Sequence, residues 1–226
     1  MNKNKILGFF YPWIIIYIAT FLIGIGAFFN VAFGQIVDSF PWTHNFENFI
    51  TLEQDTTNDR DWWLMQGPTS SQLTGPQGDH TTGSGIYYYA EASTNGVGFP
   101  YQTFISYTPM FDVSQTPGKV LSFWYHMYGS TMGDLEVGVL DTNGYTAIDT
   151  ISGNQGTSWK FAYYTLPSSN LFKVVFKATT GSSFYSDICI DDIMVSDPFA
   201  VIYGCIDTVS SNYDSTATHD DGSCIY

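Results

Sequence analysis

The acidic residues are the most numerous side chains in this sequence that could bind a ligand or a metal ion. The chain has 21 Asp and Glu residues against seven Lys and Arg, and its formal net charge is −14. Carboxylate oxygens bind hard cations such as Ca²⁺, which takes several oxygen ligands. The same excess of negative charge can serve solubility alone. The composition therefore leaves two interpretations open, a calcium site or a solvated acidic surface.

Basic residues are too few and too scattered for nucleic-acid binding. Lys3 and Lys5 lie at the amino terminus, and the other five are spread along the chain: Arg60, Lys119, Lys160, Lys173 and Lys177. Binding to a phosphate backbone depends on clustered Lys and Arg. We expect no nucleic-acid partner.

Residue patterns for zinc or nucleophilic chemistry are absent from the sequence. The four histidines (His44, His80, His126 and His219) are dispersed, with no H-E-x-x-H or H-x-H spacing. No G-x-S-x-G elbow occurs, and the segment Gly83-Ser84-Gly85 is typical of a turn. The sequence therefore predicts no catalytic residue and no enzyme.

The three cysteines fall into two kinds. Cys189 lies between two isoleucines in a strand-like run, which predicts a buried free thiol. Cys205 and Cys224 flank a segment rich in Asp and Ser. Because an exported chain meets oxidising conditions, we expect a disulfide between these two.

The amino-terminal segment, residues 1–34, predicts export. A basic start precedes an apolar run over residues 6–29, and Ala32 and Gly34 fit the small positions before a cleavage site ahead of Gln35. An apolar stretch longer than about 18 residues can instead cross a bilayer as a helix. We therefore expect a cleaved signal peptide or, alternatively, an uncleaved anchor helix as the only membrane contact.

Residues 38–197 show the pattern of an all-β sandwich. Short alternating runs place Leu121, Phe123, Tyr125 and Met127 on one strand face. Lys173 and Lys177 mark the solvent side of another run. Turn signals rich in Gly, Asn and Ser separate the runs, as expected for antiparallel strands.

Several separated blocks of this region resemble one family. They read T-G-P at 74–76, D-H-T at 79–81, L-S-F-W-Y-H-M-Y-G at 121–129, G-N-Q-G-T-S-W at 153–159 and D-I-C-I-D-D-I at 187–193. This set resembles the MAM domain, an extracellular adhesion and recognition module. The resemblance implies an antiparallel jelly-roll-like sandwich without catalytic function. Animal members usually carry four cysteines, and the positions expected for two of them hold His44 and Val120 here, so hydrophobic burial must replace the disulfides.

The resemblance also points to a calcium site. The matching acidic positions are Glu47, Asp79 and Asp192, with Asp191 as a substitute ligand. The alternative is structural. In that interpretation Asp191 and Asp192 accept backbone hydrogen bonds at a strand end, and Asp79 caps a turn.

The tail, residues 198–226, resembles a second motif. Its pattern G-C-x-D, N-Y and D-D-G-S-C is similar to a short repeat of bacterial surface and secreted proteins. Four acids in it could offer oxygen ligands, but the spacing of a twelve-residue calcium loop is missing, which favours a solvated turn. Those acids are Asp207, Asp214, Asp220 and Asp221.

The aromatic residues do not distinguish a protein ligand from a carbohydrate ligand. Tyr87, Tyr88 and Tyr89 span both faces of a strand, so we expect at least one to be exposed or interfacial, and Trp62 and Trp63 raise the same possibility. Exposed rings anchor proteins or stack on sugars. The sequence predicts a secreted or cell-surface adhesion module that binds proteins. The alternatives are a calcium-dependent carbohydrate-binding module and an accessory domain of a secreted hydrolase.

Overall fold

The computed structural model describes residues 36–93, 96–199, 202–220 and 223–226. The description below concerns the unit Val37–Tyr226 together with the adjoining Ile36. The expected signal peptide or anchor helix, residues 1–34, lies outside the described residues. No helix long and apolar enough to cross a bilayer occurs in the part of the chain that the structure describes.

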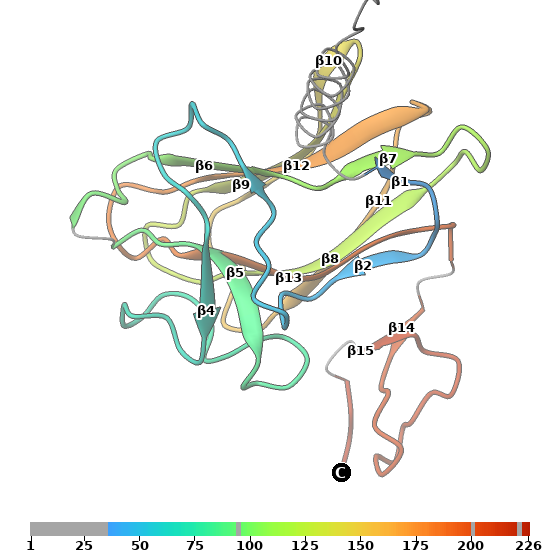
Figure 1. The fold of residues 1–226 in the computed structure, drawn as a ribbon. Helices are drawn as coiled ribbons and strands as arrows, with labels where there is room; N and C mark the ends of the chain where they lie inside the picture. Colours follow the sequence, from blue (N-terminus) through green and yellow to red (C-terminus); the bar gives the residue numbers. More distant parts are fainter. Residues whose placement is uncertain (1–35, 94–95, 200–201, 221–222) are drawn as a thin grey trace, which may run out of the picture. The chain divides into compact units, whose positions relative to one another are not determined.

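Short strands make up the described chain (Figure 1). Their bounds are β1 Ile36–Val37, β2 Trp42–His44, β3 Glu53–Gln54, β4 Trp63–Gln66, β5 Ile86–Ala90, β6 Thr103–Tyr107, β7 Met110–Asp112, β8 Val120–Met127, β9 Asp134–Asp141, β10 Gly144–Ser152, β11 Lys160–Thr165, β12 Leu171–Thr179, β13 Ile188–Ser196, β14 Tyr203–Gly204 and β15 His219–Asp220.

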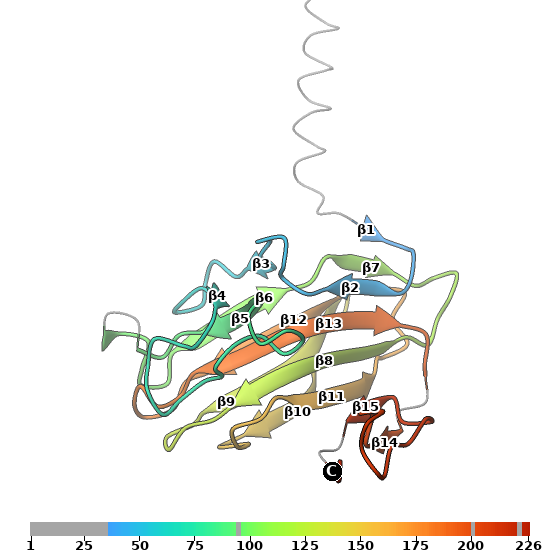
Figure 2. The same cartoon turned by 90° about the horizontal axis from the view of Figure 1, so that it is seen from below.

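Two sheets form the body of the fold. The first has the order β1-β7-β12-β6-β3, with β9 paired to β12 and β10 paired to β9. The second has the order β11-β8-β13-β5-β4, with β2 paired to β13. Pairing along β12 and β13 is antiparallel throughout. Figures 1 and 2 show the two sheets packed face to face, so the predicted all-β sandwich is confirmed.

Alternation along the strands builds the core between the sheets. The inward side chains of β8 and β12, predicted from their period of two, are buried except for Tyr125, which is half-buried against the core. Phe123 meets Phe176 edge to face with ring centroids 5.1 Å apart. Val120, at a position where animal members carry a cysteine, is buried as well. Apolar area stabilises this core at about 25 cal/mol per Å² removed from water, which is how it holds without a disulfide between the sheets.

A second, smaller core covers the outer face of the second sheet. Tyr87, Tyr89 and Cys189 are buried there, with Met65 and Trp159 packed against them. The expectation that one of the three consecutive tyrosines is exposed is therefore wrong, because none of them exceeds 4% exposure. The physical reason is that the chain between β4 and β5 folds back over this face. The Tyr87 hydroxyl donates a hydrogen bond to the Gly67 carbonyl oxygen of that segment, at 2.8 Å.

The tail has its own hydrogen bonds and a disulfide. The structure joins Cys205 to Cys224, with their Cα atoms 4.9 Å apart. Asp207 accepts from the amide of Val209 and Asp214 from Thr216, which is the local turn geometry favoured by the sequence. Of the other two acids named in the tail, Asp220 lies in β15 and Asp221 lies outside the described residues.

Candidate functional site

The loop over residues 67–85, between β4 and β5, carries the T-G-P and D-H-T blocks and is here named the motif loop. Gly75 has φ +68° and lies against Thr69, where a Cβ atom would meet the Thr69 Cγ2 at 2.4 Å. Only glycine fits this turn. The Thr74 hydroxyl then accepts the amide of Asp187 at 2.9 Å. The block therefore fastens the loop to the chain just before β13.

Asp79 caps the turn that follows. Its carboxylate accepts hydrogen bonds from the Thr82 amide (2.8 Å), the Thr82 hydroxyl (3.0 Å) and the Gly85 amide (2.5 Å). Burial alone would raise the pKa of Asp79, but these hydrogen bonds to the charged form outweigh it and hold the pKa below its usual value. Asp79 is thus ionised and fully engaged.

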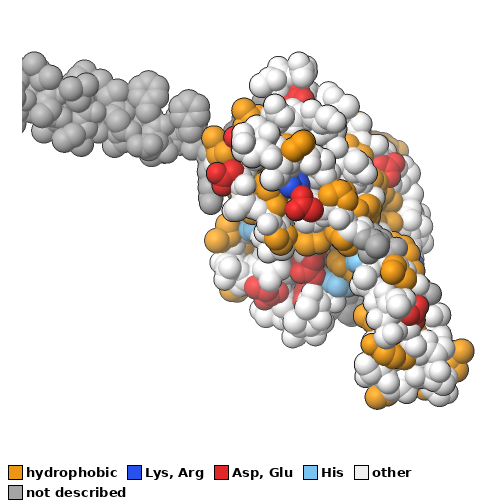
Figure 3. Space-filling model, turned by 90° about the vertical axis from the view of Figure 1, so that its right-hand side faces the viewer, with side chains coloured by type: hydrophobic (Ala, Val, Ile, Leu, Met, Phe, Trp, Pro, Cys, Tyr) orange, Lys and Arg blue, Asp and Glu red, His pale blue; other side chains and the backbone are white. Residues whose placement is uncertain are grey.

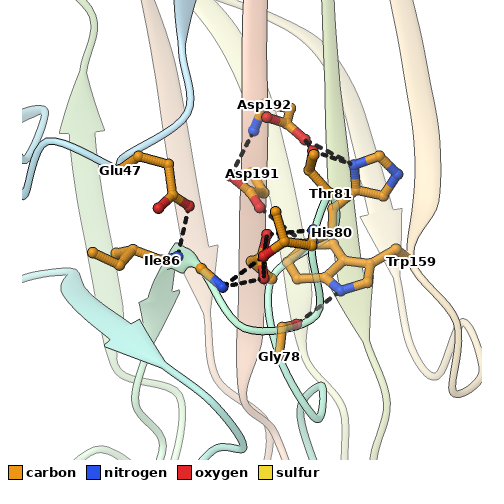
Figure 4. Close-up of polar contacts among 11 residues, drawn as sticks. Glu47, Gly78, His80, Thr81, Ile86, Trp159, Asp191 and Asp192 are labelled. Atoms are coloured by element: carbon orange, nitrogen blue, oxygen red, sulfur yellow. Dashed lines mark hydrogen bonds and ion pairs between the residues drawn. The ribbon is translucent and has the colours of Figure 1, made fainter.

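Asp191 and Asp192 lie beside it at a bulge in β13 (Figure 4). The His80 amide donates to Asp191 Oδ2 at 3.0 Å, and His80 Nδ1 lies 2.8 Å from Asp192 Oδ2. The Thr81 hydroxyl also donates to Asp192, at 2.6 Å. Burial, and then the negative charge of Asp192, raises the pKa of Asp191 to about 8. Asp191 therefore holds a proton at neutral pH.

Glu47 reaches the same cluster from the chain between β2 and β3. Its Oε1 accepts the amide of Ile86 at 2.8 Å. A Cβ atom built on Gly85 would lie 2.2 Å from that oxygen and 3.0 Å from the Asp79 carboxyl carbon. The backbone of Gly85 therefore lies between the carboxyl groups of Glu47 and Asp79. The structure brings together all four acids that the sequence suggested as ligands.

The donor chemistry of these acids fits a hard cation, because all the side-chain donors are oxygens. In the arrangement seen here, however, the carboxylates accept amide and hydroxyl hydrogens. Within the described ranges, no three Asp, Glu, His or Cys side chains are placed to hold one metal ion. The turn-capping role is visible in the geometry, and the calcium site stays a prediction.

Aromatic rings surround this acidic cluster on the outer face of the second sheet. His80 stacks on Trp124 with ring centroids 3.7 Å apart, and His219 of the tail lies over Phe161 at the same spacing. A cavity of about 610 Å³ opens beside them, with Trp159 in its wall. Figure 3 shows acidic and histidine side chains next to one another on one face of the molecule. Alternation could have placed Trp124 outward, but nothing in the sequence pairs it with His80.

The remaining side chains with reactive groups, Cys189 and His126, are buried away from solvent. Cys189 is a free thiol, fully buried, and burial raises its pKa well above the usual value, so its nucleophilic thiolate is scarce. The His126 ring lies in the interior with Nε2 3.1 Å from the Thr157 carbonyl oxygen, and burial lowers its pKa. Both groups are packing residues.

The comparison with known families fits this arrangement. The model of the MAM domain (meprin/A5/mu) matches residues 44–198. The chain belongs to the MAM domain family. The motif loop, the acidic bulge of β13 and the small outer core all lie within the matched region. MAM domains are extracellular adhesion-type domains.

Curated relatives share the domain rather than their full length. Thyroid hormone-induced protein B of Xenopus laevis is 40% identical over 159 residues, which is 68% of this chain and 22% of that protein. MAM domain-containing protein 2 of Mus musculus is 36% identical over 62% of this chain and 20% of its own. A glycosylphosphatidylinositol anchor protein of Rattus norvegicus, also named for its MAM domain, is 33% identical over 65% of this chain and 16% of its own. The chain spans about a fifth of these relatives.

Solved structures resemble the fold at low identity. The K1 cleaved adhesin domain of Lys-gingipain from Porphyromonas gingivalis W83 matches with a TM-score of 0.45 and 14% identity, covering 71% of this chain and 100% of that one. A family 61 carbohydrate-binding module in complex with β-1,4-galactotriose matches with a TM-score of 0.43 and 12% identity, over 68% of this chain and 94% of that one. Likeness at this level says nothing about function.

Proposed function

We propose that this MAM domain is a non-catalytic recognition module that binds proteins at the cell surface through side chains at its loop tips. One observation supports this most directly. Phe49, Leu73 and Tyr101 lie on three separate loops, are 70%, 67% and 66% exposed, and all have positive φ, at 57°, 63° and 57°. Large apolar side chains in left-handed backbone are uncommon in proteins.

Each of these residues carries two costs at once. A non-glycine residue in the left-handed region costs about 1–2 kcal/mol, and an exposed apolar side chain forgoes the gain from burial. Phe46 also has φ 61°, but it is buried and stacks on Tyr88 at 4.9 Å, so packing accounts for it. No such compensation exists at the three loop tips. Strain of this kind is typical of functional sites, and exposed aromatic side chains such as Tyr101 often anchor protein partners.

The test is capture of cell-surface proteins, and aggregation, by beads that carry the purified protein. We expect Phe49→Gly, Leu73→Gly and Tyr101→Gly to weaken capture while the melting temperature stays the same or rises, since glycine relieves the backbone. Val209→Ala is the matched control, because Val209 is an apolar residue that is even more exposed, lies in the tail and does not have a positive φ. Full capture by the triple variant would contradict loop-tip recognition.

Calcium belongs to the same proposal as a structural ion of the acidic cluster. Its support is the gathering of Glu47, Asp79, Asp191 and Asp192 with oxygen donors only. We expect calcium to raise the melting temperature and a chelator to reverse the rise. Asp192→Asn should lose the response, and Asp61→Asn, remote from the cluster, should keep it. An identical melting temperature with calcium and with chelator would refute the site.

For residues 1–34 we propose a secretory leader or membrane anchor ahead of the sandwich at 38–197 and the tail at 198–226. The relatives named for a glycosylphosphatidylinositol anchor are cell-surface proteins, which supports export. Intact mass of the exported protein decides between the two forms. A chain that begins at Gln35 identifies a leader, whereas retention of Met1 in the membrane fraction identifies an anchor.

A further inference from the structure

A cavity of about 500 Å³ lies where the chain passes from β3, at the edge of the first sheet, to β4, at the edge of the second. Its wall is formed by residues 54–63, here named the crossing segment, together with Phe104 of β6. None of the four acids of the predicted calcium site lines it.

Backbone hydrogen bonds hold the crossing segment rigidly on β6. The amide of Asp55 donates to the Ile105 carbonyl at 3.0 Å, and the amides of Asp59 and Arg60 both donate to the Thr103 carbonyl at 3.1 Å. Asp59 in return accepts the Thr103 amide at 2.9 Å and its hydroxyl at 2.7 Å. The cavity wall is therefore preorganised, which lowers the entropic cost of binding a ligand.

Two charged groups of the wall have unused hydrogen-bonding capacity. Arg60 is the single arginine of the chain. Its Nε is buried without a hydrogen-bond partner, and its guanidinium forms no ion pair with any described residue. Asp61 next to it accepts no hydrogen bond from the described part of the chain. Buried polar atoms in proteins are nearly always paired, so a buried, unpaired guanidinium nitrogen in a residue of a cavity wall needs an explanation.

Trp63 supplies a flat apolar surface beside these polar groups. Alternation along the chain turns Trp62 inward, where it stacks on Tyr88 at 5.2 Å, and leaves Trp63 55% exposed. Among the described residues, the Trp63 indole has no ring contact. It is thus available as a stacking surface in the wall of a cavity that is otherwise mostly polar.

The charges of the wall decide the ligand class. Asp55, Asp59 and Asp61 line the cavity together with Arg60, so the wall is net negative and repels phosphate, sulfate and sugar acids. The guanidinium in turn opposes a bare divalent cation. A neutral saccharide meets every condition, because its hydroxyls both donate to carboxylates and accept from the guanidinium, and its C–H face stacks on the indole. We propose that this cavity binds a neutral saccharide, at a site separate from the loop tips.

The experiment measures binding of the full chain to immobilised neutral oligosaccharides of glucose, galactose and mannose, with sialylated and sulfated glycans beside them. We expect saturable binding to one neutral series. Trp63→Ala should weaken it about tenfold, the size of one lost aromatic contact, and Trp63→Phe should restore part of it. Arg60→Gln should weaken it too. The melting temperatures of all three variants should match that of the natural protein, since neither side chain is part of the core.

The other outcomes overturn the proposal. They are no binding to any neutral saccharide, equal binding by Trp63→Ala, or binding of a lysine-rich peptide at this cavity instead. Failure here is distinguishable from failure of the proposed protein recognition. Trp63→Ala is expected to leave bead capture of surface proteins intact, and Leu73→Gly is expected to leave saccharide binding intact.

Discussion

The motif loop and the crossing segment both carry acidic side chains close to the edge of the sandwich, yet only the crossing segment leaves one of its carboxylates without a hydrogen bond from the described residues. In the motif loop, Asp79 accepts three hydrogen bonds from its own turn. In the crossing segment, Asp61 accepts none from the described residues, and Arg60 beside it has a buried Nε without a partner. The acids of the first region are occupied by hydrogen bonds, whereas the second keeps the open carboxylate of Asp61 beside the paired carboxylates of Asp55 and Asp59.

This difference separates residues that hold the fold from residues that can meet a ligand. A carboxylate whose oxygens are occupied by amides stabilises a turn, and removing it leaves those amides unpaired. An unoccupied carboxylate contributes little to folding and keeps its hydrogen-bonding capacity for a partner. The charge count of the sequence treats the two kinds alike, and the structure distinguishes them by their partners.

The largest expected effect comes from removing the satisfied acid. Asp79→Ala should lower the free energy of unfolding by about 4 kcal/mol, because it leaves two amides and a hydroxyl without their charged acceptor at a buried site. Asp61→Ala, the matched control, should change it by less than about 0.5 kcal/mol, as for most surface substitutions. Chemical denaturation of both variants checks this. Equal losses would break the comparison between the two regions.

The next effect is expected from pH, through Asp187 at the base of the motif loop. Burial, and then the charge of Glu91, raises its pKa to about 7, although the Ala92 amide donates to Oδ1 at 2.9 Å. The unfolded chain ionises this group near pH 4, so between pH 4 and pH 7 the folded state binds more protons and stability falls as pH rises. We expect a loss of up to about 4 kcal/mol from this residue, since the pKa shift is about three units and each unit corresponds to about 1.4 kcal/mol.

Asp187→Asn isolates that contribution. The variant keeps an oxygen for the Ala92 amide and cannot ionise. It should therefore be more stable than the natural protein above pH 7 and similar to it near pH 4. Part of the slope should survive, because the pKa of Asp191 is raised in the same direction. Melting temperatures of both proteins between pH 4 and pH 8 provide the measurement, and a stability that rises over this interval would contradict the assignment.

The sandwich and the gathering of its acids were predictable from the sequence, for separate reasons. Alternation alone assigns the inward faces of β8 and β12, since a period of two leaves no other face for their apolar residues. Glu47 and Asp192 are far apart in the chain, and only the resemblance to a known family places them together. No pattern in the residues specifies that contact.

Two features were not predictable. The alternation of Tyr87, Tyr88 and Tyr89 shows which rings point outward from the strand, but not that the motif loop returns to cover them. Whether the Arg60 side chain finds a hydrogen-bond partner depends on where the backbone of the crossing segment binds to β6. Thr103, which accepts the Arg60 amide there, lies about forty residues further along the chain. A single arginine between two aspartates ahead of paired tryptophans was the available signal, and it indicates polarity without showing whether the charges are paired.

The smallest expected effect concerns Leu73, an exposed and strained residue of the motif loop. Leu73 is exposed and has φ 63° although the acids around this loop are satisfied. Leu73→Gly should raise the free energy of unfolding by about 1 kcal/mol, since glycine adopts this backbone without a clash while a leucine pays for it. The gain is reduced because glycine also makes the unfolded chain more flexible.

Leu73→Ala is the informative partner of that variant. It removes the same exposed side chain but keeps a Cβ atom in the left-handed region, so its stability should stay within about 0.5 kcal/mol of the natural protein. A gain for glycine and none for alanine locates the cost in the backbone rather than in the exposed apolar group. If both variants bind surface proteins weakly while only the glycine variant is stabilised, the leucine side chain serves recognition. The backbone strain at position 73 then lowers stability without any benefit to folding.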